Sequence, residues 1–221
     1  MIDSQDMVDK ANLPMTKELE IIHSQILACT KCELHEGRKN AVPGEGPADA
    51  KIVFVGEGPG QNEDEQGKPF VGAAGKLLTE LLESIGLSRS DVFITNIVKC
   101  RPPSNRAPRK FEIEACNPYL KEQIRLVNPR IVCALGTPAI TTLLGEEYSA
   151  TKAHGKAIAK DNLMVLPLYH PAAALYDASL KEVLASDFRT LKKLLEETSS
   201  LPHNAEREKE GKLRETLERW V

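Results

Sequence analysis

This 221-residue chain is poor in aromatic side chains, which make up 5% of it, and it lacks a long apolar run. No segment approaches the ~20 consecutive apolar residues of a membrane-spanning helix, so we expect no contact with a membrane. Net positive charge is also absent. The formal charge of -3 gives no argument for nucleic-acid binding from overall charge, although a local basic patch can still bind. The first ten residues carry Asp3, Asp6 and Asp9 where a secretion signal has basic and apolar regions, so we expect a cytoplasmic protein.

The chain has five cysteines, and structural disulfides are not expected in that compartment. Cys29 and Cys32 form a C-x2-C pair, Cys100 directly follows an apolar run, and Cys116 lies in the next helical segment. Four such thiolates can form a tetrahedral set for zinc or for an iron–sulfur cluster, and the wide separation of the second pair suits a cluster. Four plain buried thiols, or a thioredoxin-like redox pair, are the alternatives. Cys133, in the middle of an apolar run, is predicted to be a core residue.

Four strand-like runs recur along the chain, and a helical pattern follows each of them. The strands are predicted over 51–55, 92–97, 130–135 and 163–168, and the helices over 73–86, 110–127, 137–145 and 179–197. Strands that alternate with helices predict parallel pairing, with helices on both faces of the sheet. We therefore expect an α/β fold with three α/β/α layers around a central four-stranded parallel sheet.

The domain organisation follows from composition. Residues 1–15 are polar and predicted to be flexible, and 16–197 form one folded domain that starts with a helix from Thr16 into the first cysteine pair. Residues 198–221 are a charged extension with apolar residues at helical spacing, at Leu213, Leu217 and Trp220. We expect this extension to be a helix that either packs back on the domain or binds a partner.

Polar and aromatic residues follow the predicted strands at their carboxyl ends, the edge where open α/β sheets bind ligands. Glu57 lies in the glycine-rich turn 56–60, Asn96 ends the second strand, and His170 follows the fourth. Phe70, between glycines, can serve as a flat wall for a flat substrate. A core position for Phe70 and a structural hydrogen bond for Asn96 are the competing interpretations. His23, His35, His154 and His203 are expected to be ordinary surface or core histidines. Asp64, like Glu63, could orient water, and the competing interpretation of Asp64 and Glu65 is that they are ordinary surface acids.

The segment 101–110 is basic and stiffened by three prolines, and it follows Lys99 and Cys100. A rigid basic loop is typical of a platform that contacts phosphates, although many charged loops are simply solvated. Arg101, Arg106 and Arg109 are the candidate phosphate contacts.

Several motifs in register resemble one family. They are Gly56-Glu57-Gly58-Pro59-Gly60, the stretch GKPFVGAAG from Gly67 to Gly75, TNIVKCRPP from Thr95 to Pro103, and His170-Pro171-Ala172. With the four cysteines, they resemble the type-4 uracil-DNA glycosylases, the iron–sulfur branch of that superfamily, over about residues 26–195. Gly58 stands where members of the family often have alanine. The histidine-containing insertion of the relatives that cross-link to DNA is not found, so we expect turnover.

The resemblance implies a [4Fe–4S] cluster on Cys29, Cys32, Cys100 and Cys116. It also implies that uracil is flipped out of DNA and its N-glycosidic bond is hydrolysed, which leaves an abasic site for base excision repair. The implied uracil contacts are Gly56, Glu57, Gly58, a stacking Phe70, a base-reading Asn96 and His170, which donates to uracil O2. Glu57 is the first candidate for the catalytic carboxylate and Glu63 the second, and Leu175 is a candidate wedge in the DNA.

Two further functions stay open from the sequence: a non-catalytic iron–sulfur module that binds nucleic acid, and a redox protein whose cluster is the active centre. The expected partner is uracil-containing DNA, bound by a monomer. The extension 198–221 is the candidate binding segment for a replication or repair partner.

Overall fold

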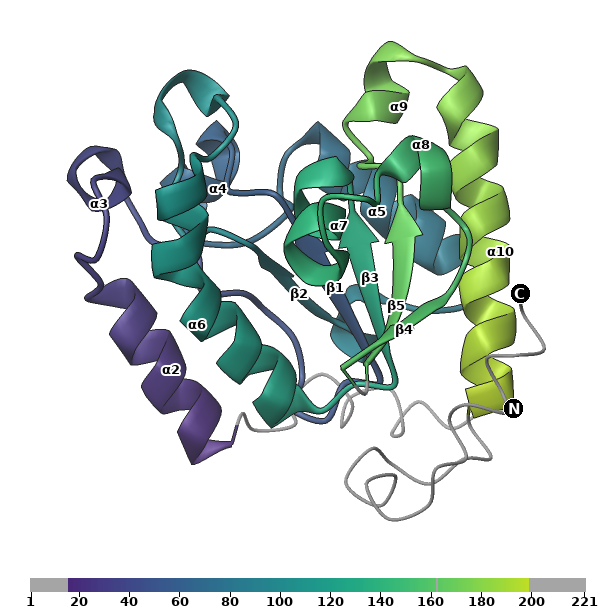
Figure 1. Ribbon diagram of the computed structural model, residues 1–221, viewed down its shortest axis with the longest axis horizontal. Helices are drawn as coiled ribbons and strands as arrows, with labels where there is room; N and C mark the ends of the chain where they lie inside the picture. The colour runs from purple at the N-terminus through teal and green to yellow at the C-terminus, as the bar shows by residue number, and fades with distance from the viewer. Residues whose placement is uncertain (1–15, 162, 199–221) are drawn as a thin grey trace, which may run out of the picture.

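The computed structural model describes residues 16–161 and 163–198 as three layers with a sheet in the middle (Figure 1). The strand order is β2-β1-β3-β5-β4, formed by β1 (Ile52–Gly56), β2 (Phe93–Asn96), β3 (Ile131–Leu135), β4 (Ile158–Lys160) and β5 (Leu163–Leu168). The pairs β2–β1, β1–β3 and β3–β5 are parallel, which confirms the four predicted strands and their direction.

The fifth strand was not predicted. β4 runs antiparallel to β5 at the edge of the sheet, so the whole sheet is mixed rather than purely parallel. The sequence offers little sign of it, because β4 has only three residues and none of them is buried. Short, exposed strands of this kind are common at sheet edges.

The main helices lie where their apolar periodicity predicts. They are α2 (Lys17–Leu27), α5 (Ala73–Ser84), α6 (Lys110–Val127), α7 (Thr137–Leu144) and α10 (Ser179–Thr198). Thr16 is the N-cap of α2, and its side chain accepts a hydrogen bond from the Leu19 amide. The shorter helical segments were not predicted: α3 (Leu34–Gly37), α4 (Gln61–Gln66), η2 (Arg89–Asp91), η3 (Pro103–Asn105), α8 (Ala150–Ala153) and α9 (Ala173–Tyr176).

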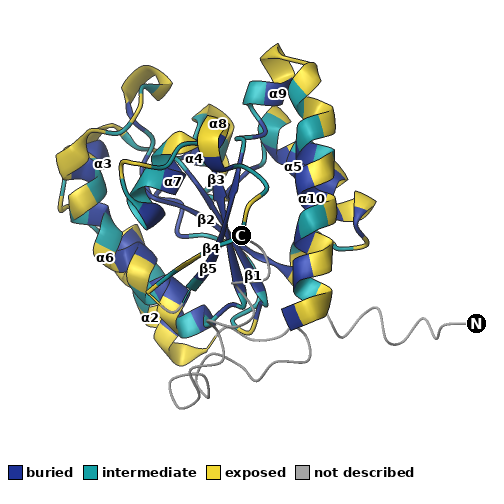
Figure 2. Cartoon of the chain, turned by 45° about the vertical axis from the view of Figure 1, so that its right-hand side comes forward, coloured by how far each residue is buried: buried dark blue, intermediate teal, exposed yellow. Residues whose placement is uncertain are grey.

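The two faces of the sheet bury two separate apolar clusters. Val53 and Val55 of β1 face the layer of α2, α6 and α7, whereas Ile52 and Phe54 face the layer of α5 and α10. Phe54 stacks on Phe188 of α10, with ring centroids 5.8 Å apart. Figure 2 shows the buried stripes of the helices turned toward the sheet. The strands are thereby held rigidly, and their carboxyl ends are fixed relative to one another.

Within the described ranges, no helix is long and apolar enough to cross a bilayer. The segment 1–15 and, apart from Thr198, the charged extension with Leu213, Leu217 and Trp220 lie outside the described residues.

Candidate active site

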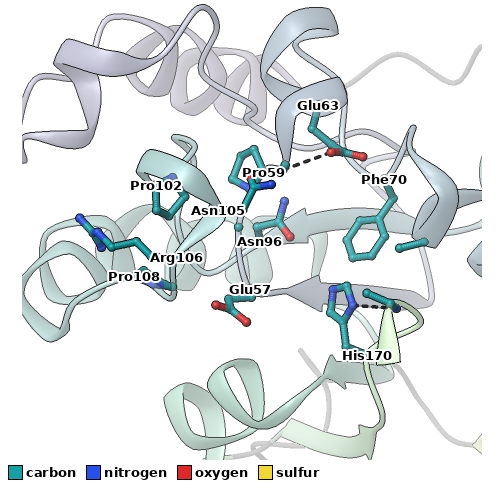
Figure 3. A pocket seen from close by; sticks show the side chains of 14 residues that line it. Glu57, Pro59, Glu63, Phe70, Asn96, Pro102, Asn105, Arg106, Pro108 and His170 are labelled. Carbon is teal, nitrogen blue, oxygen red and sulfur yellow. Dashed lines mark hydrogen bonds between the residues drawn. The ribbon is translucent and has the colours of Figure 1, made fainter. Parts of the chain in front are cut away.

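A cavity of about 390 Å³ opens at the carboxyl ends of the parallel strands. Glu57, Phe70, Asn96 and His170 all line it (Figure 3). They come from the turn after β1, the loop before α5, the end of β2 and the loop after β5. The predicted meeting of these four side chains at one edge of the sheet is therefore confirmed.

Phe70 is fixed in a strained conformation. Its φ is 52°, a left-handed value that costs a residue other than glycine about 1–3 kcal/mol. Arg89 donates hydrogen bonds to the carbonyl oxygens of Phe70 (3.1 Å) and Pro69 (2.8 Å). A Cβ atom on Gly75 would lie 1.7 Å from the Phe70 carbonyl oxygen, so that position requires glycine. The Phe70 ring both packs into the core and lines the cavity, so the two interpretations of it hold together.

Asn96 carries an unpaired acceptor. The residue is 1% exposed, and its Oδ1 atom has no hydrogen-bond partner among the described residues. Leaving such an acceptor buried costs about 1–3 kcal/mol unless a ligand completes it. A Cβ on Gly56 would lie 2.4 Å from this oxygen and 2.6 Å from the Phe70 ring, so glycine keeps the space between them open. This geometry favours ligand recognition over a purely structural hydrogen bond.

His170 is a neutral hydrogen-bond donor. Its imidazole is partly exposed to the cavity, yet the surrounding protein desolvates the ring and lowers the pKa to about 4. The Ala172 amide donates to Nδ1 (3.1 Å), which places the proton of the neutral ring on Nε2. The His170 and Phe70 rings stack with centroids 5.5 Å apart.

The two candidate carboxylates differ in their surroundings. Glu57 is half-buried, and desolvation raises the pKa of its carboxyl group. Within the described part of the chain this carboxylate has no side-chain partner. The Glu63 carboxylate accepts from three backbone amides, those of Gly60 (3.1 Å), Val71 (2.8 Å) and Gly72 (2.9 Å). Glu63 therefore ties the start of α4 to the Phe70 loop.

The prediction that Asp64 is a surface acid is wrong. Asp64 is 2% exposed and accepts hydrogen bonds from the amides of Lys39 (2.9 Å) and Asn40 (3.3 Å). Asp64 lies on α4 and its carboxylate reaches the loop that contains Lys39 and Asn40. No local sequence pattern reveals this contact, because the partners are distant in the sequence. Glu65 is exposed, as predicted.

The three candidate arginines have different surroundings. Arg106 forms a bidentate pair with the buried Glu112 at 2.9 and 2.6 Å. Arg101 donates to Asn105 Oδ1 (2.7 Å), and the Arg109 side chain is 56% exposed. Asn105 lines the cavity with a φ of 54°, and sequence reasoning missed it because only a strained turn brings it there.

Two exposed apolar side chains lie on α9, just past His170. Leu175 is 46% exposed and Tyr176 is 93% exposed. Leu175 was predicted to contact DNA, and its side chain is on the surface, as that role requires. The exposed Tyr176 beside it was not singled out from the sequence.

The four cysteines line a second cavity, between α2 and α6. Arg38 donates to Cys100 Sγ (3.1 Å). Burial raises the pKa of Cys32, Cys100 and Cys116, that of Cys116 to about 11. In the ranges that the structure describes, no three His, Cys, Asp or Glu side chains are arranged to hold a single metal ion. The four cysteines nevertheless offer four soft sulfur ligands around this one cavity. Cys133 is fully buried in β3, as predicted.

Comparison with known proteins places the chain in a family. The model of the uracil DNA glycosylase superfamily matches residues 43–196. The chain belongs to the uracil-DNA glycosylase superfamily. The match covers the base-pocket residues, Cys100 and Cys116, but it starts after Cys29 and Cys32.

Proteins named type-4 uracil-DNA glycosylase are similar to this member of the superfamily over most of its length. The protein from Sulfurisphaera tokodaii is 50% identical, covering 80% of this chain and 84% of the relative. Those from Archaeoglobus fulgidus and Thermotoga maritima are 46% and 44% identical, each covering 80% of this chain and 94% of the relative. A type-5 uracil-DNA glycosylase from Pyrobaculum aerophilum is 34% identical over 59% of this chain. The predicted resemblance to the type-4 branch is confirmed.

Proposed function

We propose that the protein removes uracil from DNA by hydrolysing the N-glycosidic bond, which leaves an abasic site for base excision repair. The observation that carries this proposal is the single cavity in which Phe70, His170 and the unpaired Oδ1 of Asn96 meet. The names of the type-4 relatives support it. Because the target base is stacked inside a duplex, the nucleotide must first be extruded, at a cost of a few kcal/mol.

Recognition of uracil is assigned to Asn96 and Phe70. The Oδ1 atom of Asn96 would accept from uracil N3–H, and its Nδ2 group would donate to O4. Cytosine presents the opposite pattern and would leave buried groups unpaired, at about 1–3 kcal/mol each. Phe70 would stack on the ring. Gly56 and Gly58 would approach the base through their backbones. At Gly56 a Cβ would enter the space between Asn96 and the Phe70 ring.

Bond cleavage is assigned chiefly to His170. Negative charge grows on uracil O2 as the base departs, and a fixed neutral Nε2–H donor can stabilise it. The lowered pKa and the Nδ1 acceptor role suit this task, because they keep the donor in place at neutral pH. Uracil leaves as an anion, so a strong general acid is not required.

Glu57 is assigned to the sugar side of the reaction. A carboxylate at the cavity wall can orient the attacking water or balance the oxocarbenium-like charge of the deoxyribose. Glu63 is assigned a positioning role instead, because three backbone amides already occupy its carboxylate.

Contacts with the DNA backbone are assigned to Arg101 and Arg109 of the basic loop. The 3.7 Å ion pair of Arg109 with Glu33 joins two exposed side chains, so it leaves Arg109 accessible to a phosphate. Arg106 is engaged with Glu112, so its contribution is to hold this loop in shape. Leu175 would enter the gap that the flipped nucleotide leaves.

We infer that Cys29, Cys32, Cys100 and Cys116 hold a [4Fe–4S] cluster. Four sulfur donors around one cavity suit it, and their wide separation in the sequence is more typical of a cluster than of a zinc site. Bound there, it would staple α2 and the basic loop to β2 and add its binding free energy to folding. Iron and sulfide analysis with the visible spectrum tests this assignment, and a colourless protein with one stoichiometric zinc would refute it.

The deciding experiment for the function is an excision assay on a uracil-containing oligonucleotide, with thymine and hypoxanthine substrates beside it. We expect free uracil and an alkali-labile abasic site. Binding of the strand without any abasic product would instead support the non-catalytic or redox alternatives.

A further inference from the structure

One lysine ammonium is buried between the base pocket and the four-cysteine cavity. Lys99 is 1% exposed, lies directly before Cys100 and lines the cavity that the cysteines share. A buried charge is costly by several kcal/mol unless it is fully hydrogen-bonded and close to an opposite charge. The partners of Lys99 therefore indicate what the residue is for.

Three acceptors surround the Lys99 nitrogen. Nζ donates to Thr95 Oγ1 (2.6 Å), to the Asn96 carbonyl oxygen (2.7 Å) and to Gln123 Oε1 (2.7 Å). None of these three groups donates a hydrogen bond to the Lys99 nitrogen. Two of them are carbonyl oxygens, which only accept. The third, the Thr95 hydroxyl, donates its hydrogen to the Pro43 carbonyl (2.9 Å) or to Gln123 Oε1 (3.2 Å). The Lys99 nitrogen therefore needs three hydrogens to satisfy its three acceptors, and only the charged ammonium form of lysine has three.

The four-cysteine cavity is the place beside Lys99 where an opposite charge can form. Among the residues that the structure describes, no carboxylate pairs with Lys99, and its three hydrogen-bond partners are neutral. Lys99 lines the same cavity as the sulfur atoms of Cys29, Cys32, Cys100 and Cys116, which would carry negative charge when they hold a cluster. The Lys99 backbone amide approaches the Cys116 sulfur as a donor. The ammonium thus contacts the backbone of Asn96 and lies within the field of the cysteine sulfurs.

We propose that Lys99 is a positioning residue that couples the two sites, because it holds the Asn96 backbone by a hydrogen bond and supplies a counter-charge to the four-cysteine site. This inference rests on the proposed function for the role of Asn96. Its second half concerns the sulfur site alone. A cation at this place favours each added negative charge on the sulfur site, so its removal must lower the reduction potential of a bound cluster.

The test is Lys99→Met in the full-length, cluster-loaded protein, with the exposed Lys192→Met as the control for the loss of one lysine. We expect Lys99→Met to lower the single-turnover excision rate on uracil about tenfold or more, since a charge-assisted hydrogen bond is lost. The midpoint potential, measured by titration followed by electron paramagnetic resonance, should shift to a more negative value. Lys192→Met should change neither quantity.

A second variant separates charge from hydrogen bonding. Gln123→Glu places a carboxylate on the ammonium without removing the Lys99 donor to the Asn96 carbonyl. It also removes the Gln123 Nε2 donor to the Pro43 carbonyl, which keeps the Thr95 hydroxyl as a partner. The potential should again become more negative, while excision stays within about threefold of the wild type. This variant also serves if Lys99→Met fails to fold.

Either of two results overturns the inference: an unchanged potential in both variants, or wild-type excision by a folded Lys99→Met protein. If the wild-type protein itself releases no uracil, the proposed function fails. The potentials then still decide whether Lys99 acts as the counter-charge.

Discussion

At the scale of single residues, the site depends on protonation states that the fold sets. His170 has an ordinary residue type, and its chemistry comes from burial and from the Ala172 amide that occupies Nδ1. Its position after a strand was predictable from the sequence. Its tautomer was not, because that depends on one hydrogen bond in a loop after β5.

Replacing His170 by alanine should remove the donor to uracil O2. We expect the excision rate to fall about 100-fold or more, the usual effect of losing one such donor, with little change in the affinity for DNA. Single-turnover kinetics and a binding titration measure the two quantities. An equal loss in both would contradict the assigned role.

The lowered pKa of His170 also predicts how stability depends on pH. Between pH 6.5 and about 4 the unfolded chain binds a proton on this histidine that the folded protein does not bind. Lowering the pH through this window should therefore destabilise the wild type relative to His170→Gln, which cannot titrate. Melting temperatures of both proteins across the window test this, and a constant difference would show that the pKa is not lowered.

At the scale of elements, the loop between α4 and α5 is the least predictable part of the site. Phe70 and Gly75 belong to a motif that can be recognised in the sequence. The left-handed backbone of Phe70, however, is held by hydrogen bonds from Arg89 and to the Glu63 carboxylate, which the motif does not reveal. These contacts join segments that are distant in sequence, so no local periodicity encodes them. By contrast, the regular periods of α5, α6 and α10 made those helices predictable.

Gly75→Ala tests this loop. The new Cβ would meet the Phe70 carbonyl oxygen and force the loop to move, so we expect a large loss of uracil excision. Gly37→Ala is the matched control, because nothing lies within 4 Å of a Cβ at that position. Circular dichroism separates a displaced loop from global unfolding, and an active, folded Gly75→Ala protein would contradict the argument.

The basic loop should divide into two functions. Arg101→Ala with Arg109→Ala should weaken DNA binding and reduce the slope of log affinity against log salt by about 2, as expected for two lost phosphate contacts. Arg106→Ala should instead lower the free energy of unfolding by about 1–3 kcal/mol, because Glu112 is left buried without its partner. A salt-slope change as large in Arg106→Ala as in the double variant would reverse this division.

At the scale of the whole molecule, the alternation of strands and helices was sufficient to predict the layers and the parallel strands. It missed β4 because a three-residue exposed edge strand leaves no pattern. The cysteines are the other whole-molecule feature, since they join α2, the end of β2 and α6 around one cavity. Their meeting was predictable only through the resemblance to a family, because spacing alone left buried thiols and zinc open.

Cys29→Ser should show how far the fold depends on the four-cysteine site, which we call the junction of α2, β2 and α6. We expect loss of the absorbance of the proposed iron–sulfur cluster, a lower melting temperature and faster proteolysis within α2, because the binding free energy of that cluster would no longer support folding. Cys133→Ser is the control for a cysteine outside the junction: any change in stability there should leave the absorbance intact. An unchanged melting temperature in Cys29→Ser would mean that α2 packs on the rest of the domain without support from the four-cysteine site.

The pocket walls are contributed by segments that extend from Glu57 to His170, so they meet only after every parallel strand has found its neighbour. A chain that ends before β5 lacks the loop with His170, and therefore one wall of the pocket. Excision of a base is thus a property of the completed sheet, which no fragment of the chain supplies alone.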